Sequence, residues 1–441
     1  MNQKLVHIET YGCTANQNNS EILAGILSRA GYLITNNIEI AEIIIFNTCV
    51  VKSKTESKIK RRIQDIQKEH KNKIIVITGC MPETDFKKLK KLAPNILLLG
   101  THKFKDILNL LRDFEENKLT KEKQAEYLSQ NPETKLNLPK KPNNPLISIH
   151  QISEGCLGEC SFCKTRLAKG KLFSYNKEEI LKSIESDLQQ GAKEIWLTSQ
   201  DNAAYGLDQK DKKSKLPELL SEILNLKHKF KLRLGMCDPN NILPILNELI
   251  KIYENPKMFK FIHIPIQSAS NSVLKHMNRF YIIEQAEKII EEFRKQIPDI
   301  TIATDIIVGY PTETEEVHKQ NINFISKFKP DVLNISKFSS HKSTPAGKLK
   351  ILPANTLKKR ATELMQIHKE TAKQNKQKYI NKTIKVFIDK KISENLYQAR
   401  DENYNIVYLK SSKENLGKEV EVKIKSIGVH NLLAEIIENK N

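Results

Sequence analysis

Short apolar segments alternate with polar segments of helical periodicity along most of this chain of 441 residues. In its first part the apolar segments are residues 4–9, 42–46 and 73–78, and the helical segments include residues 20–30 and 55–69. Alternation of this kind is typical of parallel sheets whose strands are connected by helices. We therefore expect an α/β fold that begins with a parallel-sheet domain over residues 1–112.

A second series of the same kind follows an irregular stretch. Its apolar segments are residues 147–151, 194–198, 231–235, 261–264, 301–308 and 331–335, with helical segments such as 177–189 and 282–295 between them. These strand–helix units predict a partial or complete (β/α) barrel over residues 146–377, and we expect a partial (β/α)6 barrel. The preceding residues, 113–145, are rich in Lys, Asn, Glu and Pro and predict an interdomain linker.

The periodicity changes near the end of the chain. A basic helical segment, residues 356–378, is followed by apolar–polar alternation at residues 383–390, 396–400, 406–409, 419–425 and 432–437. A period of two indicates strands, and several short strands so close together predict a small β-barrel. We place this third domain at residues 378–441.

Lys and Arg together outnumber Asp and Glu by 72 to 52, which gives a formal net charge of +20. This excess favours a polyanionic partner, although an organism whose proteins are all rich in Lys would produce the same excess. No apolar run approaches the roughly 20 residues that span a bilayer, and the first residues lack the apolar stretch of a secretory signal. We expect a cytoplasmic protein without membrane association.

Three of the seven cysteines, Cys156, Cys160 and Cys163, form a C-x3-C-x2-C motif just after the first strand of the second series. An odd number of cysteines without an export signal favours metal ligation, catalysis or buried thiols over disulfides. Three thiolates this close in a loop can hold a [4Fe-4S] cluster, whose fourth iron stays open to S-adenosylmethionine. The alternatives are a zinc site completed by His150 or Cys237, and three buried thiols.

The motif resembles that of the radical S-adenosylmethionine superfamily. In that superfamily an aromatic residue before the third cysteine packs near the adenine of S-adenosylmethionine, and Phe162 stands at this position. The resemblance therefore implies a cofactor contact for Phe162. The alternative is a loop aromatic that covers the cluster.

Cys13, Cys49 and Cys80 each lie just past the expected end of a strand in the first domain. About one strand–helix unit separates each from the next, so parallel connectivity would bring all three to one edge of the sheet. That edge is where open α/β sheets bind ligands. Any one of these cysteines alone would be interpreted as a buried apolar residue, but together they predict a second cluster.

The combined motifs resemble the methylthiotransferase family over essentially the whole chain. Beside the cysteines, the matching runs are His263-Ile264-Pro265-Ile266-Gln267-Ser268, Met277-Asn278-Arg279 and Thr304-Asp305-Ile306-Ile307-Val308-Gly309-Tyr310-Pro311. The resemblance implies two [4Fe-4S] clusters. It assigns an auxiliary cluster to Cys13, Cys49 and Cys80, and a radical-forming cluster to Cys156, Cys160 and Cys163.

Residues at the ends of the central strands are further candidates. We expect Gln200, Asp201 and Gln267 to point toward S-adenosylmethionine or substrate, with ordinary loop hydrogen bonds as the alternative. We expect Gly309 to let the nucleoside approach the backbone closely. No catalytic side chain is predicted beyond the cluster ligands. His341-Lys342-Ser343 departs from the Arg-Pro-Gly that is common in the family.

The carboxy-terminal domain resembles the TRAM domain, a small β-barrel that binds tRNA. Candidate phosphate contacts are Lys382, Lys385, Lys390, Lys391, Arg400, Lys410, Lys423 and Lys425. Tyr397, Tyr404 and Tyr408 are expected either to stack on bases or to fill the barrel.

Short motifs such as Cys163-Lys164-Thr165 resemble the archaeal and eukaryotic branch of the family. That branch converts N6-threonylcarbamoyladenosine at position 37 of tRNA to its 2-methylthio derivative by radical chemistry. The alternatives are methylthiolation of isopentenyladenosine or of a ribosomal-protein aspartate and, from another class, a non-catalytic metal-containing RNA-binding protein. The resemblance implies tRNA, an electron donor and a sulfur source as partners, and we expect a monomer.

Overall fold

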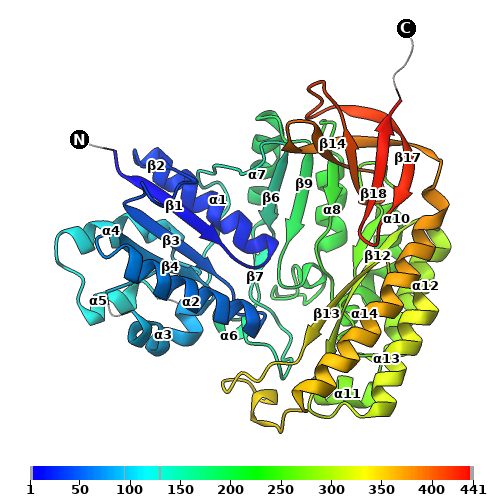
Figure 1. Ribbon diagram of the computed structural model, residues 1–441, viewed down its shortest axis with the longest axis horizontal. Coiled ribbons are helices and arrows are strands. Elements are labelled where there is room, and N and C mark those ends of the chain that lie inside the picture. The colour runs from blue at the N-terminus through cyan, green and yellow to red at the C-terminus, as the bar shows by residue number, and fades with distance from the viewer. Residues whose placement is uncertain (1–2, 94, 129–130, 438–441) are drawn as a thin grey trace.

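The computed structural model describes residues 3–93, 95–128 and 131–437. Figure 1 shows three regions: an amino-terminal sheet with helices, a central region of strands and outer helices, and a barrel near the carboxyl terminus. The expected α/β class is confirmed. Residues 438–441, at the end of the expected third domain, lie outside the described part of the chain.

The amino-terminal sheet is wholly parallel, in the order β2-β1-β3-β4-β5. Its strands are β1 (Leu5–Thr10), β2 (Leu33–Ile34), β3 (Ile43–Thr48), β4 (Ile74–Gly79) and β5 (Leu97–Leu98). The three expected strands are confirmed, whereas β2 and β5 are too short to leave a periodic signal. The strand order reverses between β1 and β3, which is where such sheets open a crevice for ligands.

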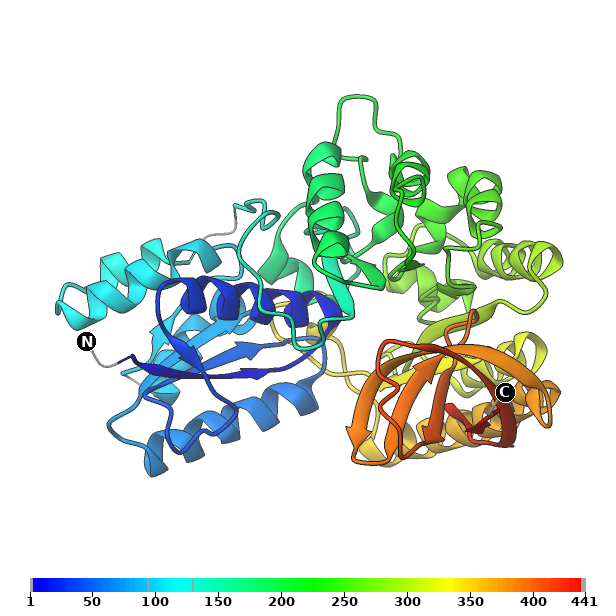
Figure 2. The ribbon, with the colours of Figure 1, turned by 90° about the horizontal axis from the view of Figure 1, so that it is seen from above.

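Helices cover both faces of this sheet. They are α1 (Thr14–Arg29), α2 (Ser53–Glu69), α3 (Met81–Leu92) and α4 (Ile107–Glu115), the last preceded by η1 (Phe104–Asp106). Figure 2 shows α1 and α2 on opposite sides of the strands. In β3, Ile43 and Ile45 pack against α1 and α4, whereas Ile44 and Phe46 pack against α2 and α3. This alternation follows from the period of two in a strand.

The expected linker, residues 113–145, is more ordered than its composition predicts. Helix α4 extends into it as far as Glu115, and α5 (Lys121–Glu126) lies within it. The Gln124 side chain bonds both backbone groups of Leu98, at 3.1 and 2.7 Å, and so fixes α5 to the first domain. This contact could not be predicted from the charged and polar sequence, because a single buried amide produces no periodicity.

The central region is an open arc of parallel strands. They are β6 (Ile147–Gln151), β9 (Glu194–Thr198), β10 (Lys231–Arg233), β11 (Phe261–His263), β12 (Thr301–Val308) and β13 (Val332–Lys337). The sheets β6-β9-β10 and β11-β12-β13 are connected by parallel bridges from Leu232 to Met258 and from Met236 to His263. The partial (β/α)6 barrel is therefore confirmed, with each expected strand present.

Helices line the outside of this arc and bury a large apolar core against it. The longer ones are α7 (Lys177–Gln189), α8 (Leu216–Leu224), α10 (Leu246–Tyr253), α12 (Ile283–Gln296), α13 (Glu315–Phe328) and α14 (Ala354–Lys376). The shorter ones are α6 (Thr165–Lys169), α9 (Pro239–Ile242), α11 (Asn271–His276), η2 (Asn202–Ala204), η3 (Leu243–Ile245), η4 (Ala346–Lys348) and η5 (Gln377–Tyr379). A small antiparallel pair, β7 (Ser153–Glu154) with β8 (Phe173–Ser174), frames the loop of the C-x3-C-x2-C motif.

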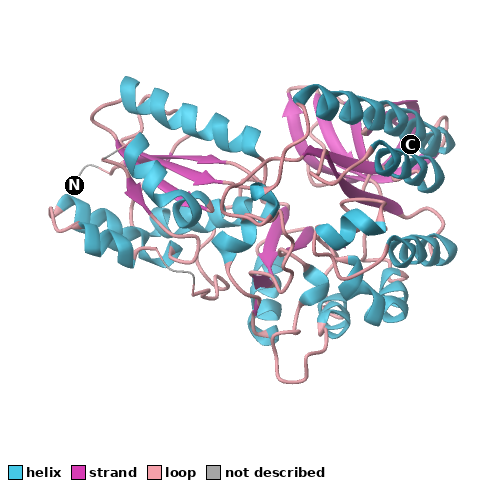
Figure 3. Ribbon diagram, turned by 90° about the horizontal axis from the view of Figure 1, so that it is seen from below, coloured by secondary structure: helices cyan, strands magenta, loops and turns pink. Residues whose placement is uncertain are grey.

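The carboxy-terminal strands form a closed barrel in the order β14-β15-β16-β18-β17. They are β14 (Thr383–Ser393), β15 (Leu396–Arg400), β16 (Ile406–Lys410), β17 (Glu419–Ile427) and β18 (Asn431–Ile436). This confirms the expected small barrel. In Figure 3 its strands lie at the end of the molecule away from the amino terminus.

The turn between β15 and β16 fastens the barrel to the central arc. Tyr404, at a positive φ of 64°, places its ring 4.9 Å from the rings of both Phe259 and Phe261 and 5.9 Å from that of Trp196. The Arg400 guanidinium lies 3.9 Å from the centre of the Tyr404 ring. Aromatic and cation–π contacts of this kind hold the two domains in one orientation.

In the described part of the chain, each helix is too short or too polar to span a bilayer.

Candidate functional site

The three amino-terminal cysteines meet at the carboxyl edge of the first sheet. Cys13 precedes α1, Cys49 follows β3 and Cys80 precedes α3. Because β1, β3 and β4 are neighbours in the sheet, their ends bring these residues together, as the strand–helix spacing predicts.

Glycines make this close approach possible. Gly12 has a φ of +105°, and a β-carbon at this position would lie 2.6 Å from Cys49 Cβ and 2.7 Å from Cys49 Sγ. Gly79 has a φ of +84°, and its missing β-carbon leaves room for the carbonyl of Thr48. The backbone N–H of Cys80 donates to that same carbonyl at 3.0 Å. Each cysteine is thus fixed against the end of the neighbouring strand.

Buried amides stiffen the same edge. Asn16 Nδ2 donates to the carbonyls of Tyr11 and Thr48, both at 2.8 Å. Asn47 Nδ2 donates to the carbonyl of Asn16 at 2.7 Å and to Ser20 Oγ at 2.8 Å. These bonds connect β1, β3 and α1 around the cysteines, so the thiols sit on a rigid support.

The thiols differ in exposure. Cys13 is exposed, whereas Cys49 and Cys80 are buried. Burial raises the pKa of Cys49 to about 11 and that of Cys80 to about 12. The thiols of Cys13 and Cys49 raise the pKa of Cys80 further, whereas Lys169 lowers it. Thiols in this state are protonated, so a metal that binds them must displace protons.

A buried charge cluster lies beside Cys80. Lys169 of α6 donates to Thr101 Oγ1 at 2.7 Å and contacts Glu154 at 3.3 Å, and Lys135 also pairs with Glu154. Nδ1 of His102 lies 2.5 Å from the same carboxylate. Burial opposes ionisation of Glu154, but the two ammonium groups outweigh it and lower the pKa of this carboxyl. Burial lowers the pKa of Lys135 to about 7, whereas Glu154 and the nearby thiols raise that of Lys169 against the effect of burial, so Lys169 is the firmer positive charge beside Cys80.

The second group of cysteines lies in the loop between β7 and α6. Cys156, Cys160 and Cys163 are all partly exposed. The N–H of Gly158 donates to Cys156 Sγ at 3.2 Å, and the N–H of Cys163 donates to the carbonyl of Cys160 at 3.0 Å. A β-carbon on Gly158 would lie 3.3 Å from Cys156 Sγ and 3.7 Å from Cys160 Sγ, so both sulfurs border this glycine.

Arg279 holds one of these thiols in place. Its Nη1 donates to Cys160 Sγ at 3.3 Å, while Nη2 pairs with Asp238 at 2.6 Å and donates to the carbonyl of Pro265 at 3.1 Å. Burial opposes a charged guanidinium, but Asp238 outweighs it and raises the pKa of Arg279. Arg279 thus connects the sulfur of Cys160 to Asp238 and to the loop after β11.

Phe162 packs on an apolar cluster that includes Met277 and Tyr310. The neighbouring Ser161 is bonded through its N–H to the carbonyl of Met277 and through Oγ to the carbonyl of His276, both at 2.9 Å. The motif loop is therefore held by the end of α11 and by the segment after β12. The Phe162 ring lies at the border of this loop.

Two of the expected cofactor residues lie at the end of β9. Gln200 is partly exposed, and its buried Oε1 has no hydrogen-bond partner within the described chain. Asp201 accepts from the N–H groups of Ala203 and Asp238 and from Asn241 Nδ2, at 3.1, 2.9 and 2.7 Å. Burial raises the pKa of Asp201 to about 6. Asp201 thus makes the loop hydrogen bonds of the alternative interpretation, whereas Gln200 keeps an acceptor for a ligand.

The other two expected residues have distinct backbone roles. Gln267 adopts a φ of 67° and exchanges backbone bonds with Asp305 and Ile307, at 2.8 and 2.9 Å, which ties the loop after β11 to β12. Gly309 has a φ of +76°, and a β-carbon there would lie 2.4 Å from Leu357 Cγ of α14. Gly309 therefore permits a close approach to α14, and the expected approach of a nucleoside to its backbone stays a prediction.

The zinc alternative loses both of its fourth ligands. His150 is buried, with Nε2 2.9 Å from Ser148 Oγ and 3.2 Å from Asp187. Cys237 is buried in the apolar core. Within the described residues, no three His, Cys, Asp or Glu side chains converge as closely as the ligands of a single ion do. The ligands of a four-iron cluster stand at separate corners of a cube and lie farther apart.

The barrel presents most of its expected lysines to solvent, but two expected contacts are corrected. Arg400 is buried, where it pairs with Asp389 at 3.0 Å and stacks on Tyr404. Tyr404 packs on the central arc, so neither residue is free for RNA. Tyr397 fills the barrel core, as the alternative interpretation predicts, and Tyr408 is half-buried.

Several residues at the two sites were not predicted. They are Lys135, Lys169, Glu154, His102 and, at the junction of the domains, Lys164 with Glu56 and Asp85. Single charged residues carry no periodic signal, and the pairs join positions in different elements of the fold. The sole hint was the position of Lys164 directly after a motif cysteine.

Three family models match successive parts of the chain. They are described as Uncharacterized protein family UPF0004 at residues 5–100, Radical SAM superfamily at residues 151–325 and TRAM domain at residues 377–437. The matches fall on the three regions of the fold and contain both groups of cysteines.

Relatives match over the full length. A probable threonylcarbamoyladenosine tRNA methylthiotransferase of Archaeoglobus fulgidus is 36% identical, over 98% of this chain and 98% of the relative. The threonylcarbamoyladenosine tRNA methylthiotransferase of Homo sapiens is 33% identical, over 96% of this chain and 72% of the relative. Among solved structures, the radical S-adenosylmethionine methyltransferase TsrM from Kitasatospora setae superimposes with a TM-score of 0.57 at 14% identity, over 78% of this chain and 77% of that chain. That likeness concerns the fold.

Proposed function

The chain belongs to the family of threonylcarbamoyladenosine tRNA methylthiotransferases, and we propose that it converts N6-threonylcarbamoyladenosine at position 37 of tRNA to its 2-methylthio derivative. It is a radical S-adenosylmethionine enzyme. The observation that carries the proposal is the presence of two cysteine triads on domains whose elements α3 and α6 are in contact.

We assign the auxiliary [4Fe-4S] cluster to Cys13, Cys49 and Cys80. The radical-forming [4Fe-4S] cluster is assigned to Cys156, Cys160 and Cys163. Thiolates suit iron, and each group of cysteines offers three of them, which leaves one iron of each cluster for another ligand. When bound, these clusters and S-adenosylmethionine supply one-electron cleavage of the sulfonium and a sulfur for transfer.

The protein's own residues prepare these sites. Arg279 orients Cys160, and Lys169 with Lys135 places positive charge beside Cys80. Phe162 and Gln200 are proposed contacts of S-adenosylmethionine, because the Phe162 ring borders the cysteine loop and Gln200 Oε1 is buried without a partner. Asp201, Gln267 and Gly309 are proposed to act indirectly, because they fix the conformation of the loops around the S-adenosylmethionine contacts.

The remaining partners follow from the chemistry. The exposed lysines of the barrel are proposed to bind tRNA phosphates, and a reductant and a sulfur source must serve the reaction. We propose a cytoplasmic monomer. Its proposed domains are residues 1–112 for the auxiliary cluster, 146–377 for radical chemistry and 378–441 for tRNA, with 113–145 connecting the first two.

Anaerobic reconstitution tests the proposal. The protein is loaded with iron and sulfide and is incubated with dithionite, S-adenosylmethionine and tRNA that carries N6-threonylcarbamoyladenosine. Loading should reach about eight irons per chain, from two four-iron cubes. Nucleoside mass spectrometry should then find a mass gain of CH2S on the threonylcarbamoyl nucleoside.

Parallel substrates separate the alternatives. A product on isopentenyladenosine tRNA, or on a ribosomal protein, in place of the threonylcarbamoyl product would assign the chain to another branch. Absence of any methylthio product with both clusters loaded would overturn the enzymatic function. Zinc in place of iron would support a non-catalytic RNA-binding protein.

A further inference from the structure

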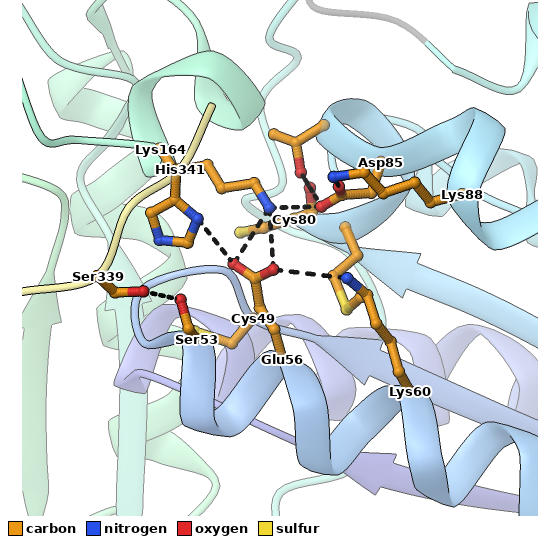
Figure 4. A network of polar contacts seen from close by, with 12 residues as sticks. Cys49, Ser53, Glu56, Lys60, Cys80, Asp85, Lys88, Lys164, Ser339 and His341 are labelled. Carbon is orange, nitrogen blue, oxygen red and sulfur yellow. Dashed lines mark hydrogen bonds and ion pairs between the residues drawn. The ribbon is translucent and has the colours of Figure 1, made fainter. Parts of the chain in front are cut away.

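A buried ion-pair network joins the two cysteine-bearing domains. Lys164 directly follows Cys163, and its Nζ lies 3.1 and 3.0 Å from the two carboxylate oxygens of Glu56 and 2.5 Å from Asp85 Oδ2. Figure 4 shows the Lys164 side chain reaching between these two carboxylates. Glu56 belongs to α2 and Asp85 to α3, so one ammonium contacts two helices of the other domain.

Each charged residue of the network lies only a few residues along the chain from a cysteine. Helix α2 begins four residues after Cys49, and α3 begins immediately after Cys80. Glu56 and Asp85 each lie within the first two turns of their helices. The path from a cysteine of one group to a cysteine of the other is therefore short. Helix α3 kinks at Asp85, where φ is −130° and ψ is 24°, so the ion pair with Lys164 acts at the bend of this helix.

The three charged side chains of this network are buried, so their ion pairs favour one relative placement of the two domains. Lys164, Glu56 and Asp85 are 5%, 6% and 4% exposed. Burial opposes ionisation of Asp85, but hydrogen bonds from Lys164 and Lys88 outweigh it and lower its pKa to about 2. A buried ion pair adds little net stability compared with apolar packing, but removal of one partner leaves a charge that must move toward water. Its effect is thus chiefly on how the two domains are placed.

A third segment contacts the same carboxylate. His341 Nδ1 lies 3.6 Å from Glu56 Oε1, and Ser339 is hydrogen-bonded to Ser53 at the start of α2. Both residues come from the loop after β13. The network in Figure 4 therefore connects the cysteine loop, helices α2 and α3 of the first domain and the loop after β13.

Apolar packing already holds the domains in contact without Lys164. Ala168 of α6 is fully buried within the apolar core of the first domain. Loss of the ion pairs should therefore shift the domains slightly, while each remains folded.

We propose that Lys164 is a positioning residue that sets the distance and angle between the two cysteine triads. The inference rests on the proposed function, in which one triad serves radical formation and the other serves sulfur transfer. With Lys164 present, cleavage of S-adenosylmethionine is coupled to formation of the methylthio product. Without it, cleavage continues but the product falls.

The test compares Lys164→Met with Lys88→Met. Both variants remove an ammonium that contacts Asp85, but Lys88 is an exposed residue of α3 and its ion pair with Asp85 stays within that helix. With iron content equal to wild type, Lys164→Met should raise the ratio of 5′-deoxyadenosine to methylthio product by roughly tenfold to a hundredfold, because a misplacement of about 1 Å has effects of this size. Lys88→Met should keep the wild-type ratio.

A second measurement does not depend on the product. In the dithionite-reduced protein, magnetic interaction between the two clusters should speed electron-spin relaxation, and Lys164→Met should weaken that effect. Glu56→Gln, which leaves the cysteine loop untouched, should change relaxation in the same direction. If Lys164→Met keeps the wild-type ratio and relaxation, or fails through loss of iron, the inference is overturned. If wild type makes no product but its clusters interact and Lys164→Met weakens this interaction, the proposed function fails and the positioning role stands.

Discussion

Gly12 lies so close to Cys49 that a β-carbon on the glycine would meet the cysteine sulfur at 2.7 Å. Because no side chain stands between them, the ends of β1 and β3 can present Cys13 and Cys49 to one site. The φ of +105° at Gly12 also turns the chain from β1 into α1. One residue thus provides both the turn and the space.

A Gly12→Ala variant should lose the auxiliary cluster. The added methyl group would displace the Cys49 side chain, and iron after reconstitution should fall from about eight to about four per chain. Gly31→Ala is the matched control, since Gly31 has a similar φ of +93° with nothing within 4 Å of the added carbon. Equal iron content in both variants would show that the contact with Cys49 has no role.

The two cysteine groups should be separable by their products. Cys80→Ala should retain about four irons per chain and still form 5′-deoxyadenosine, but it should make no methylthio nucleoside. Cys160→Ala should lose both activities, because the radical site initiates the reaction. These results are read by iron analysis and mass spectrometry, and formation of 5′-deoxyadenosine by Cys160→Ala would contradict the assignment.

Lys169 should tune the auxiliary cluster. Its ammonium is buried, and its charge acts on Cys80 and Cys13. Loss of a nearby positive charge makes a cluster harder to reduce, so Lys169→Met should lower its reduction potential by an amount on the order of tens of millivolts. Potentiometric EPR on a Cys156→Ala background, which lacks the radical-forming cluster, measures this directly. An unchanged or higher potential would contradict the prediction.

Glu194 should make stability depend on pH. Burial raises its pKa from 4.5 to about 7 in the folded chain, although Arg400 opposes this rise. Between these values the folded state holds a proton that the unfolded state has released, so the free energy of unfolding falls as pH rises from about 4.5 to about 7. Glu194→Gln should remove this loss and raise the free energy of unfolding at pH 8 by roughly 2–3 kcal/mol.

Urea denaturation at two pH values checks that result. At pH 4.5 wild-type Glu194 is already protonated in the folded state, so the variant should unfold with nearly the wild-type free energy. Equal stabilisation at both pH values would mean that packing, and not protonation, explains the change.

Tyr404 should stabilise the contact between the barrel and the central arc, whereas Tyr408 should not. Tyr404→Ala removes a ring that contacts Phe259, Phe261 and Trp196 and should reduce the free energy of unfolding by about 3 kcal/mol. Tyr408→Ala, on the half-buried face of β16, should have a smaller effect on stability. Calorimetry of both variants decides this, and an equal loss in both would contradict the docking role.

Much of the fold follows from periodic patterns in the sequence. The strands β6, β9 and β12 match the expected ranges because each concentrates apolar and β-branched residues in a short segment. The convergence of Cys13, Cys49 and Cys80 could be predicted for the same reason, since parallel strands end at one edge.

The rest depends on contacts that leave no local pattern. Gln124 fixes α5 through two hydrogen bonds, and the role of Gly309 depends on Leu357 of a distant helix. The partners of Lys164 lie in another domain, so no stretch of sequence contains the pair. Such features become visible once the domains are placed together.

The turn at Tyr404 has a consequence for substrate choice. Because the Tyr404 ring packs on the central arc, an RNA bound to the barrel lysines as proposed would reach the cysteine loops across a constant span. An adenosine at the wrong number of base pairs from the gripped part of the RNA would stop short of the sulfur or pass beyond it. With tRNA bound to the barrel as proposed, the length of a stem would select the substrate together with the chemistry of the base.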